Sequence, residues 1–232
     1  MGRGSPACRW HRIHALAQTR KGCLIFQSPL TSTNTRPAKD GCFVFPSPLN
    51  ASEPVAVQSG LLNLNASSGA AAGSISSVSV ASGATLLVSR SDQVNNTATV
   101  TLSGGTIRAA GGVTEVFGNL NVGTASFLDF GATSLASQSR LSFGTYTPSA
   151  LLTIDNFNYG STLIFKSDLT SSINNTNSFV FNNGGIASTS WNQSTSTFTI
   201  TAIPEPSTYI AALGLLGLCL LPLVRRKRAK VA

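Results

Sequence analysis

The sequence of 232 residues predicts an all-β fold, and three properties of its composition indicate this. Charged residues make up only 10% of the chain, whereas a usual soluble domain has about 25%. There are 21 glycines, and serine, threonine and asparagine are abundant, which is typical of closely spaced turns. Finally, 42% of the residues are apolar, which is too many for a typical disordered chain.

Short segments rich in β-branched and aromatic residues recur between residues 56 and 203, and each is predicted to be a strand. In residues 97–102, Ala98, Val100 and Leu102 share one face and threonines share the other, which indicates a half-buried strand. The other predicted strands are 84–88, 127–130, 140–143, 151–154, 162–165, 178–181 and 197–200. Glycine or asparagine separates them, and no stretch has a convincing helical pattern.

Two all-β architectures fit these strands: a sandwich of two sheets, and a solenoid of stacked short coils. Stacked coils place like residues above one another, and uncharged Ser, Thr and Asn tolerate this where charges would repel. The short strands and the scarcity of charge therefore favour the solenoid. The spacing between strands widens after Gly144, which predicts a capping region or a hairpin layer there.

The segment from Ala84 to Gly131 resembles the autotransporter-associated β-strand (passenger) repeat. The matching elements are Leu86-Leu87, the strand and turn from Asn95 to Thr106, the step from Glu115 to Leu120, and Asp129-Phe130-Gly131. The resemblance implies a right-handed parallel β-helix in an exported surface protein, without catalytic activity.

The C-terminal segment begins with Pro204-Glu205-Pro206, continues with sixteen uncharged residues, Tyr209–Val224, and ends in a basic cluster. Each proline prevents a helix from continuing, so Glu205 is expected to be extended and exposed. As a helix, Tyr209–Val224 would be about 24 Å long. That is short for a bilayer, but thinning and snorkelling absorb the mismatch. We therefore expect one transmembrane α-helix in contact with membrane lipid, with its C-terminus in the cytoplasm.

This tail resembles the PEP-CTERM protein-sorting domain across residues 203–228. The resemblance implies recognition of Pro204, Glu205 and Pro206 by an exosortase, cleavage near that motif, and release of the domain to the cell surface or the matrix of an exopolysaccharide-producing bacterium. The stop-transfer residues that it implies are Arg225, Arg226, Lys227 and Arg228.

The predicted organisation has four parts: residues 1–55, 56–203, 204–228 and a cytoplasmic tail, 229–232. Residues 1–55 are basic and aperiodic, and we expect them to be disordered or misassigned. An exported chain needs an apolar signal of about 7–15 residues, and the apolar runs at 23–26 and 42–45 are too short. A misassigned or truncated start is preferred to a fragment of a longer passenger.

The charges argue against nucleic-acid binding, because they are basic in the tails, while residues 55–203 carry four cations and five acids. The acids are Asp92, Glu115, Asp129, Asp155 and Asp168. Without a histidine, this region cannot form a serine triad. The cluster Cys8, His11 and His14 has no second ligand pair, so we expect no metal or cofactor.

The sequence therefore predicts a non-enzymatic, exported structural protein of the bacterial surface or extracellular matrix. Its uncharged hydroxyls and amides suggest exopolysaccharide as a partner. The alternatives are a membrane-tethered glycan-active β-helix enzyme, which needs two carboxylates within about 10 Å in a groove, and a permanently anchored protein whose tail is never cleaved.

Overall fold

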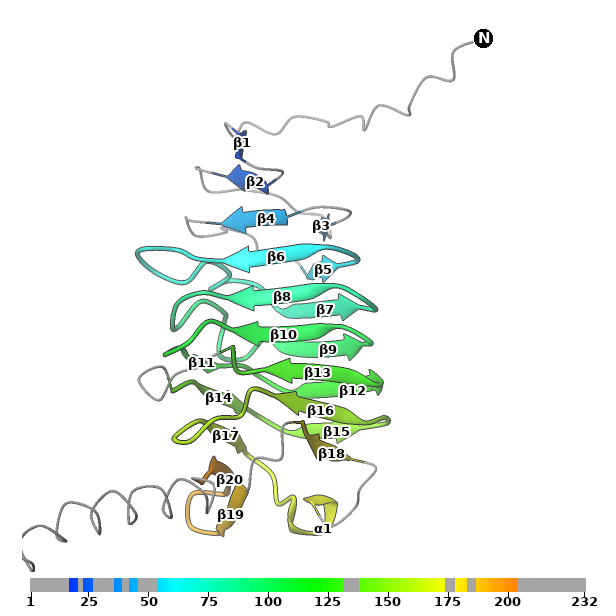
Figure 1. Cartoon of the computed structure of the whole chain (residues 1–232), viewed down its shortest axis with the longest axis vertical. Coiled ribbons are helices and arrows are strands. Elements are labelled where there is room, and N and C mark those ends of the chain that lie inside the picture. The colour runs from blue at the N-terminus through cyan, green and yellow to red at the C-terminus, as the bar shows by residue number, and fades with distance from the viewer. Residues whose placement is uncertain are drawn as a thin grey trace, which may run out of the picture.

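The computed structural model describes residues 54–131, 138–173, 178–182 and 187–203, together with the backbone of four earlier strands. The chain forms a parallel β-solenoid of about five turns, with the strands stacked as rungs along one axis (Figure 1). This confirms the predicted solenoid and excludes the sandwich, because neighbouring strands of the body pair in parallel.

Three sheets form the walls of the column. The nine-stranded sheet contains, in spatial order, β1 (Ala17–Arg20), β2 (Cys23–Phe26), β4 (Cys42–Phe45), β6 (Leu61–Leu64), β8 (Thr85–Val88), β10 (Thr106–Ala109), β13 (Ser126–Asp129), β16 (Leu152–Asp155) and β18 (Phe179–Phe181). The six-stranded sheet contains β15 (Tyr146–Pro148), β12 (Leu120–Thr124), β9 (Thr99–Ser103), β7 (Ser77–Ala81), β5 (Val55–Val57) and β3 (Arg36–Ala38). The five-stranded sheet contains β11 (Thr114–Val116), β14 (Arg140–Phe143), β17 (Thr162–Phe165), β20 (Thr197–Ala202) and β19 (Ala187–Asn192).

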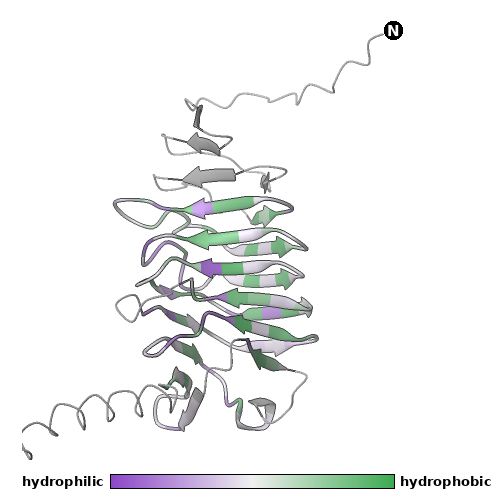
Figure 2. Cartoon of the chain, in the orientation of Figure 1, coloured by the Kyte–Doolittle hydropathy of each residue, from purple (hydrophilic) through white to green (hydrophobic). Residues whose placement is uncertain are grey.

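The core consists of apolar columns that run along the axis. In the nine-stranded sheet, Leu62, Leu86, Ile107, Leu128 and Ile154 are successive register partners, and each is at most 2% exposed. In β9 and β16 alternate residues point outward, and there the inward positions are apolar and the outward ones are Thr, Ser or Asp (Figure 2). Burial of these inward apolar residues holds the coils together.

Aromatic rings form a second core column behind the five-stranded sheet. The ring centroids of Phe117 and Phe143 lie 5.0 Å apart, and those of Phe143 and Phe165 lie 5.7 Å apart. All three rings are at most 2% exposed. Offset stacking of this kind adds about 0.5–1.5 kcal/mol per pair beyond the burial of apolar area.

Glycines make the corner before the nine-stranded sheet. Gly60, Gly83 and Gly104 precede successive strands of that sheet, and their φ angles are 75°, 73° and 87°. L-residues with a side chain rarely adopt this left-handed region, so the recurrence of glycine follows from the geometry of the corner.

The predicted strands and the predicted cap agree with the structure. Each of the eight apolar segments overlaps a strand, and the inward residues Ala98, Val100 and Leu102 are all 0% exposed. After β17 the chain forms a single helical turn, α1 (Thr170–Ile173), and the antiparallel hairpin β19–β20, which pairs with β17. This hairpin is the layer expected beyond Gly144. Four strands, β1 to β4, lie in the segment 1–55, where none was predicted.

Candidate functional site

The predicted sorting motif follows directly on the solenoid. Strand β20 ends at Ala202. Pro204, Glu205 and Pro206, the apolar segment Tyr209–Val224 and the basic residues Arg225, Arg226, Lys227 and Arg228 lie outside the described residues, so their roles stay predictions. Within the part of the chain that is described, no helix has the length and apolar character that a membrane crossing requires.

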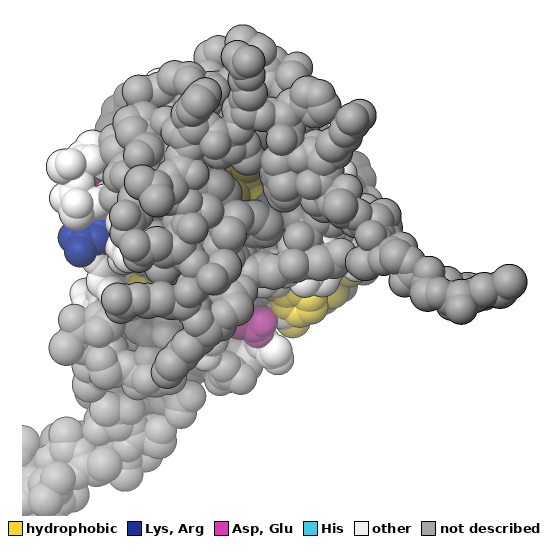
Figure 3. All heavy atoms as spheres, turned by 90° about the horizontal axis from the view of Figure 1, so that it is seen from above, with side chains coloured by type: hydrophobic (Ala, Val, Ile, Leu, Met, Phe, Trp, Pro, Cys, Tyr) yellow, Lys and Arg dark blue, Asp and Glu magenta, His cyan; other side chains and the backbone are white. Residues whose placement is uncertain are grey.

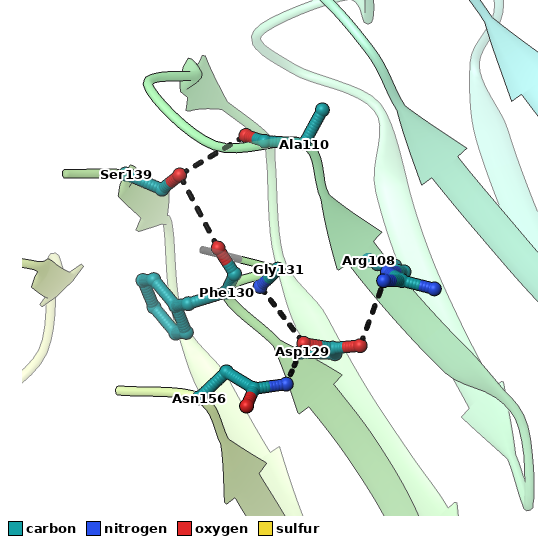
Figure 4. Close-up of polar contacts among 7 residues, drawn as sticks. All are labelled: Arg108, Ala110, Asp129, Phe130, Gly131, Ser139 and Asn156. Carbon is teal, nitrogen blue, oxygen red and sulfur yellow. Dashed lines mark hydrogen bonds and ion pairs between the residues drawn. The ribbon is translucent and has the colours of Figure 1, made fainter. Parts of the chain in front are cut away.

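A polar ladder lies on the outer face of the nine-stranded sheet (Figure 4). Arg108 of β10 and Asp129 of β13 are register partners, and Arg108 Nε lies 3.2 Å from Asp129 Oδ2. Asp129 Oδ1 accepts hydrogen bonds from the backbone N–H of Gly131, at 2.8 Å, and from Nδ2 of Asn156, at 2.7 Å. The Arg108 side chain is 52% exposed and that of Asp129 is 17% exposed. An ion pair this exposed contributes about 1 kcal/mol or less to stability, so its main effect is to fix both side chains in place.

A second carboxylate lies one rung further along. Asp155 of β16 is the register partner of Asp129, so the two backbones are about 4.8 Å apart. The glycan-active enzyme hypothesis requires two neighbouring carboxylates, and this pair is of the required kind. Neither of the two residues is among those that line the groove described below. Among the residues that the structure describes, no group of three or more His, Cys, Asp or Glu side chains is placed to hold a metal ion.

The acid Glu115 is buried in the core. In the five-stranded sheet it is the register partner of Leu141, which in turn pairs with Leu163, and its exposure is 0%. Its Oε2 accepts the backbone N–H of Gln93 at 2.7 Å, and its Oε1 accepts that of Val94 at 3.0 Å. Burial raises the pKa of Glu115 to about 7, although these two N–H groups act in the opposite direction.

A polar groove of about 840 Å³ opens above this buried acid, between the loops that follow β6 and β8. Its lining includes Ala66, Arg90, Asp92, Gln93 and Asn96. Gln93 is only 2% exposed, and its Oε1 accepts the N–H of Ala66 at 2.6 Å. Arg90, which the sequence places beside Asp92, donates its Nε–H to Asn65 Oδ1 at 2.9 Å. Two of the polar side chains that line the groove, Gln93 and Arg90, are thus already hydrogen-bonded, and the backbone N–H groups of Gln93 and Val94 donate to the carboxylate of Glu115.

The outer face of the six-stranded sheet has the uncharged polar character that the sequence suggests. Ser79, Thr101, Asn121 and Thr147 are successive register partners on β7, β9, β12 and β15, and all four are at least partly exposed. Such a face offers regularly spaced hydrogen-bonding groups without charge.

Sequence reasoning missed both the burial of Glu115 and the pairing of Asp129 with Arg108 and Asp155. Each depends on register between coils 21 or more residues apart, which no local pattern reveals. The one available signal was the resemblance, since Glu115 and Asp129-Phe130-Gly131 are among the residues that carry it.

Comparisons with protein families, with curated proteins and with solved structures found no match to this chain.

Proposed function

We propose that this chain is an exported structural protein of the bacterial cell surface or extracellular matrix. In this proposal a right-handed β-solenoid is the mature body, and residues 204–228 are a sorting signal that an exosortase recognises and cleaves. Tyr209–Val224 holds the precursor in the inner membrane with Arg225–Arg228 in the cytoplasm. The protein is then a substrate of the sorting enzyme and not itself a catalyst.

The observation that carries this proposal is the position of the motif. The capping hairpin ends at Ala202, and Pro204 follows after a single residue. Cleavage at the motif would leave the cap of the solenoid intact, because every described strand lies before it. The uncharged face at Ser79, Thr101, Asn121 and Thr147 is compatible with a hydrated polysaccharide matrix, which hydrogen-bonds through hydroxyls.

The test is mass spectrometry of the C-terminus of the protein recovered from the surface of a host that has an exosortase. The wild-type chain is expected to lack the residues that follow the Pro-Glu-Pro motif. Glu205→Ala is expected to keep the full tail and to remain in the inner-membrane fraction, whereas the control Ser207→Ala is processed. A wild-type surface protein with an intact tail would contradict cleavage and favour the permanent anchor.

The stacked carboxylates Asp129 and Asp155 favour one second candidate, a membrane-tethered glycan-active enzyme. This candidate predicts release of reducing sugar from the host polysaccharide, with loss of at least about a hundredfold in rate in both Asp129→Asn and Asp155→Asn. If wild-type and variants release equally little sugar, the enzyme hypothesis is wrong.

A further inference from the structure

An aromatic ring stands exposed on the outer face of the nine-stranded sheet. In β13, Ser126 and Leu128 point inward with exposures of 1% and 0%, so Phe127 between them points outward and is 39% exposed. Its register partners on the two neighbouring rungs are Thr106 and Thr153, whose side chains are small. The phenyl ring is therefore not covered by its neighbours in the column.

A second exposed apolar residue lies in this column, two rungs from Phe127. Val180 of β18 is the register partner of Thr153 and is 40% exposed. Viewed along the axis, hydrophobic side chains lie next to an acidic one on one side of the molecule (Figure 3). This face of the solenoid thus presents apolar and charged groups side by side.

The polar ladder described above forms the adjacent column. Arg108, Asp129 and Asp155 lie two residues beyond Thr106, Phe127 and Thr153 on the same strands, so the two columns are about 7 Å apart. Asp129 is held by Arg108, Gly131 and Asn156. The carboxylate of Asp155 makes no hydrogen bond or ion pair with any residue that the structure describes, so it has its full capacity as an acceptor.

This combination matches the two kinds of surface on a pyranose ring. One face of the sugar carries C–H groups, which pack against an aromatic ring, and the rim carries hydroxyls, which donate to carboxylates and accept from a guanidinium. The two carboxylates and one arginine give these residues a net charge of −1. That charge repels uronate and phosphate polymers and leaves neutral sugars as the complementary ligand.

We propose that Phe127, with Arg108, Asp129 and Asp155, forms a binding site for a neutral pyranose unit of a polysaccharide. The inference rests on the proposed function, in that it gives the matrix protein a place to hold its polysaccharide. The sugar stacks on the Phe127 ring and hydrogen-bonds across to the carboxylates, and Arg108 contacts a further hydroxyl. No bond is made or broken.

The test is affinity electrophoresis of the full-length chain in a polyoxyethylene detergent, which has no sugar head group to compete. The probes are hydroxyethylcellulose, dextran and the neutral exopolysaccharide of the host, with alginate as the anionic control. We expect retardation by at least one neutral polymer. Retardation by alginate, which follows from the net charge of +8 of the full-length chain, should be equal in wild type and Phe127→Ala. Phe127→Ala should weaken the apparent affinity about tenfold, and Phe127→Trp should retain it. The matched control is Ser142→Ala on the outer face of the five-stranded sheet, which should bind as wild type does.

Three results would overturn the inference. The first is the absence of retardation by every neutral polymer. The second is a loss of binding in Thr101→Ala but not in Phe127→Ala, which would move the sugar to the six-stranded sheet. The third is a dimer, detected by sedimentation, that Phe127→Ala dissociates, because the ring would then be a self-association contact. None of these results affects export or cleavage, which the mass of the mature C-terminus tests separately.

Discussion

Replacement of Glu115 by glutamine is expected to remove a pH dependence from the stability of the solenoid. The carboxyl group is 0% exposed, and burial raises its pKa from 4.5 to about 7. The folded state therefore binds the proton of Glu115 more tightly than the unfolded state does. Below pH 4.5 the acid is protonated in both states, and the stabilisation by the proton is fully present. It is lost progressively as the pH rises toward 7, and above that value the loss is complete.

The size of this effect follows from the shift. A difference of about 2.5 pKa units corresponds to about 3 kcal/mol in the free energy of unfolding, at 1.36 kcal/mol per unit. Glutamine cannot ionise, so the variant lacks this loss. The glutamine side-chain NH₂ would face one of the two backbone N–H groups, that of Gln93 or Val94, and the lost hydrogen bond lowers the free energy of unfolding by about 1 kcal/mol. The variant is thus expected to be less stable than wild type at pH 4.5 and more stable at pH 8.

The assay is urea unfolding followed by far-UV circular dichroism at a series of pH values. The matched control is Asp168→Asn. Asp168 is fully exposed, and hydrogen bonds from Thr170 lower its pKa, so its removal should not reproduce the crossover. A wild-type protein that gains stability relative to Glu115→Gln as the pH rises would refute the reasoning. It would mean that the two backbone N–H groups outweigh burial and hold Glu115 as a carboxylate.

Two further predictions concern packing, and both are measured by the same unfolding assay. Phe143→Ala should destabilise the chain by about 3–5 kcal/mol, because it removes the central ring of the stack with Phe117 and Phe165. Phe127→Ala should cost less than about 1 kcal/mol, because that ring is exposed. Equal costs for the two variants would contradict the assignment of Phe127 to the surface. Gly118→Ala would place a Cβ atom on the Thr97 carbonyl, within van der Waals overlap, and should cost about 1–3 kcal/mol. The control is Gly123→Ala, whose Cβ would lie 3.7 Å from its nearest neighbour. A Gly118 variant as stable as this control would show that the backbone before β12 is not closely packed against Thr97.

The sequence was informative for several strands that carry their own pattern. Alternation in residues 97–102 predicted β9 and its buried face, and the scarcity of charge predicted stacked coils. Among the described residues, the strands outside the predicted segments are β5, β6, β7, β10, β11, β12, β15 and β19. In β10, for example, Arg108 interrupts a short apolar pattern.

The candidate site could not be predicted, because it depends on which face of a strand is buried and on which coils are in register. Residues 127–130 were correctly predicted as a strand, yet the small Ser126 points inward while Phe127 points outward. Ser126 is accommodated inside because its Oγ donates to the carbonyl of Thr124 and accepts the N–H of Gly104, at 2.7 and 3.0 Å. Glu115 likewise occupies an inward position that leucine takes on the next two rungs. A carboxyl group is accommodated there because the backbone N–H groups of Gln93 and Val94 donate to it.

The central claim, that the solenoid is held outside the cell by its C-terminal segment, is tested most directly by labelling intact host cells. Antibodies against the solenoid, and a protease added to whole cells, should both reach residues 56–203, while a tag placed after Ala232 is protected in the precursor. A solenoid found only in the cytosol, with its tail intact and no association with the membrane, would contradict the account.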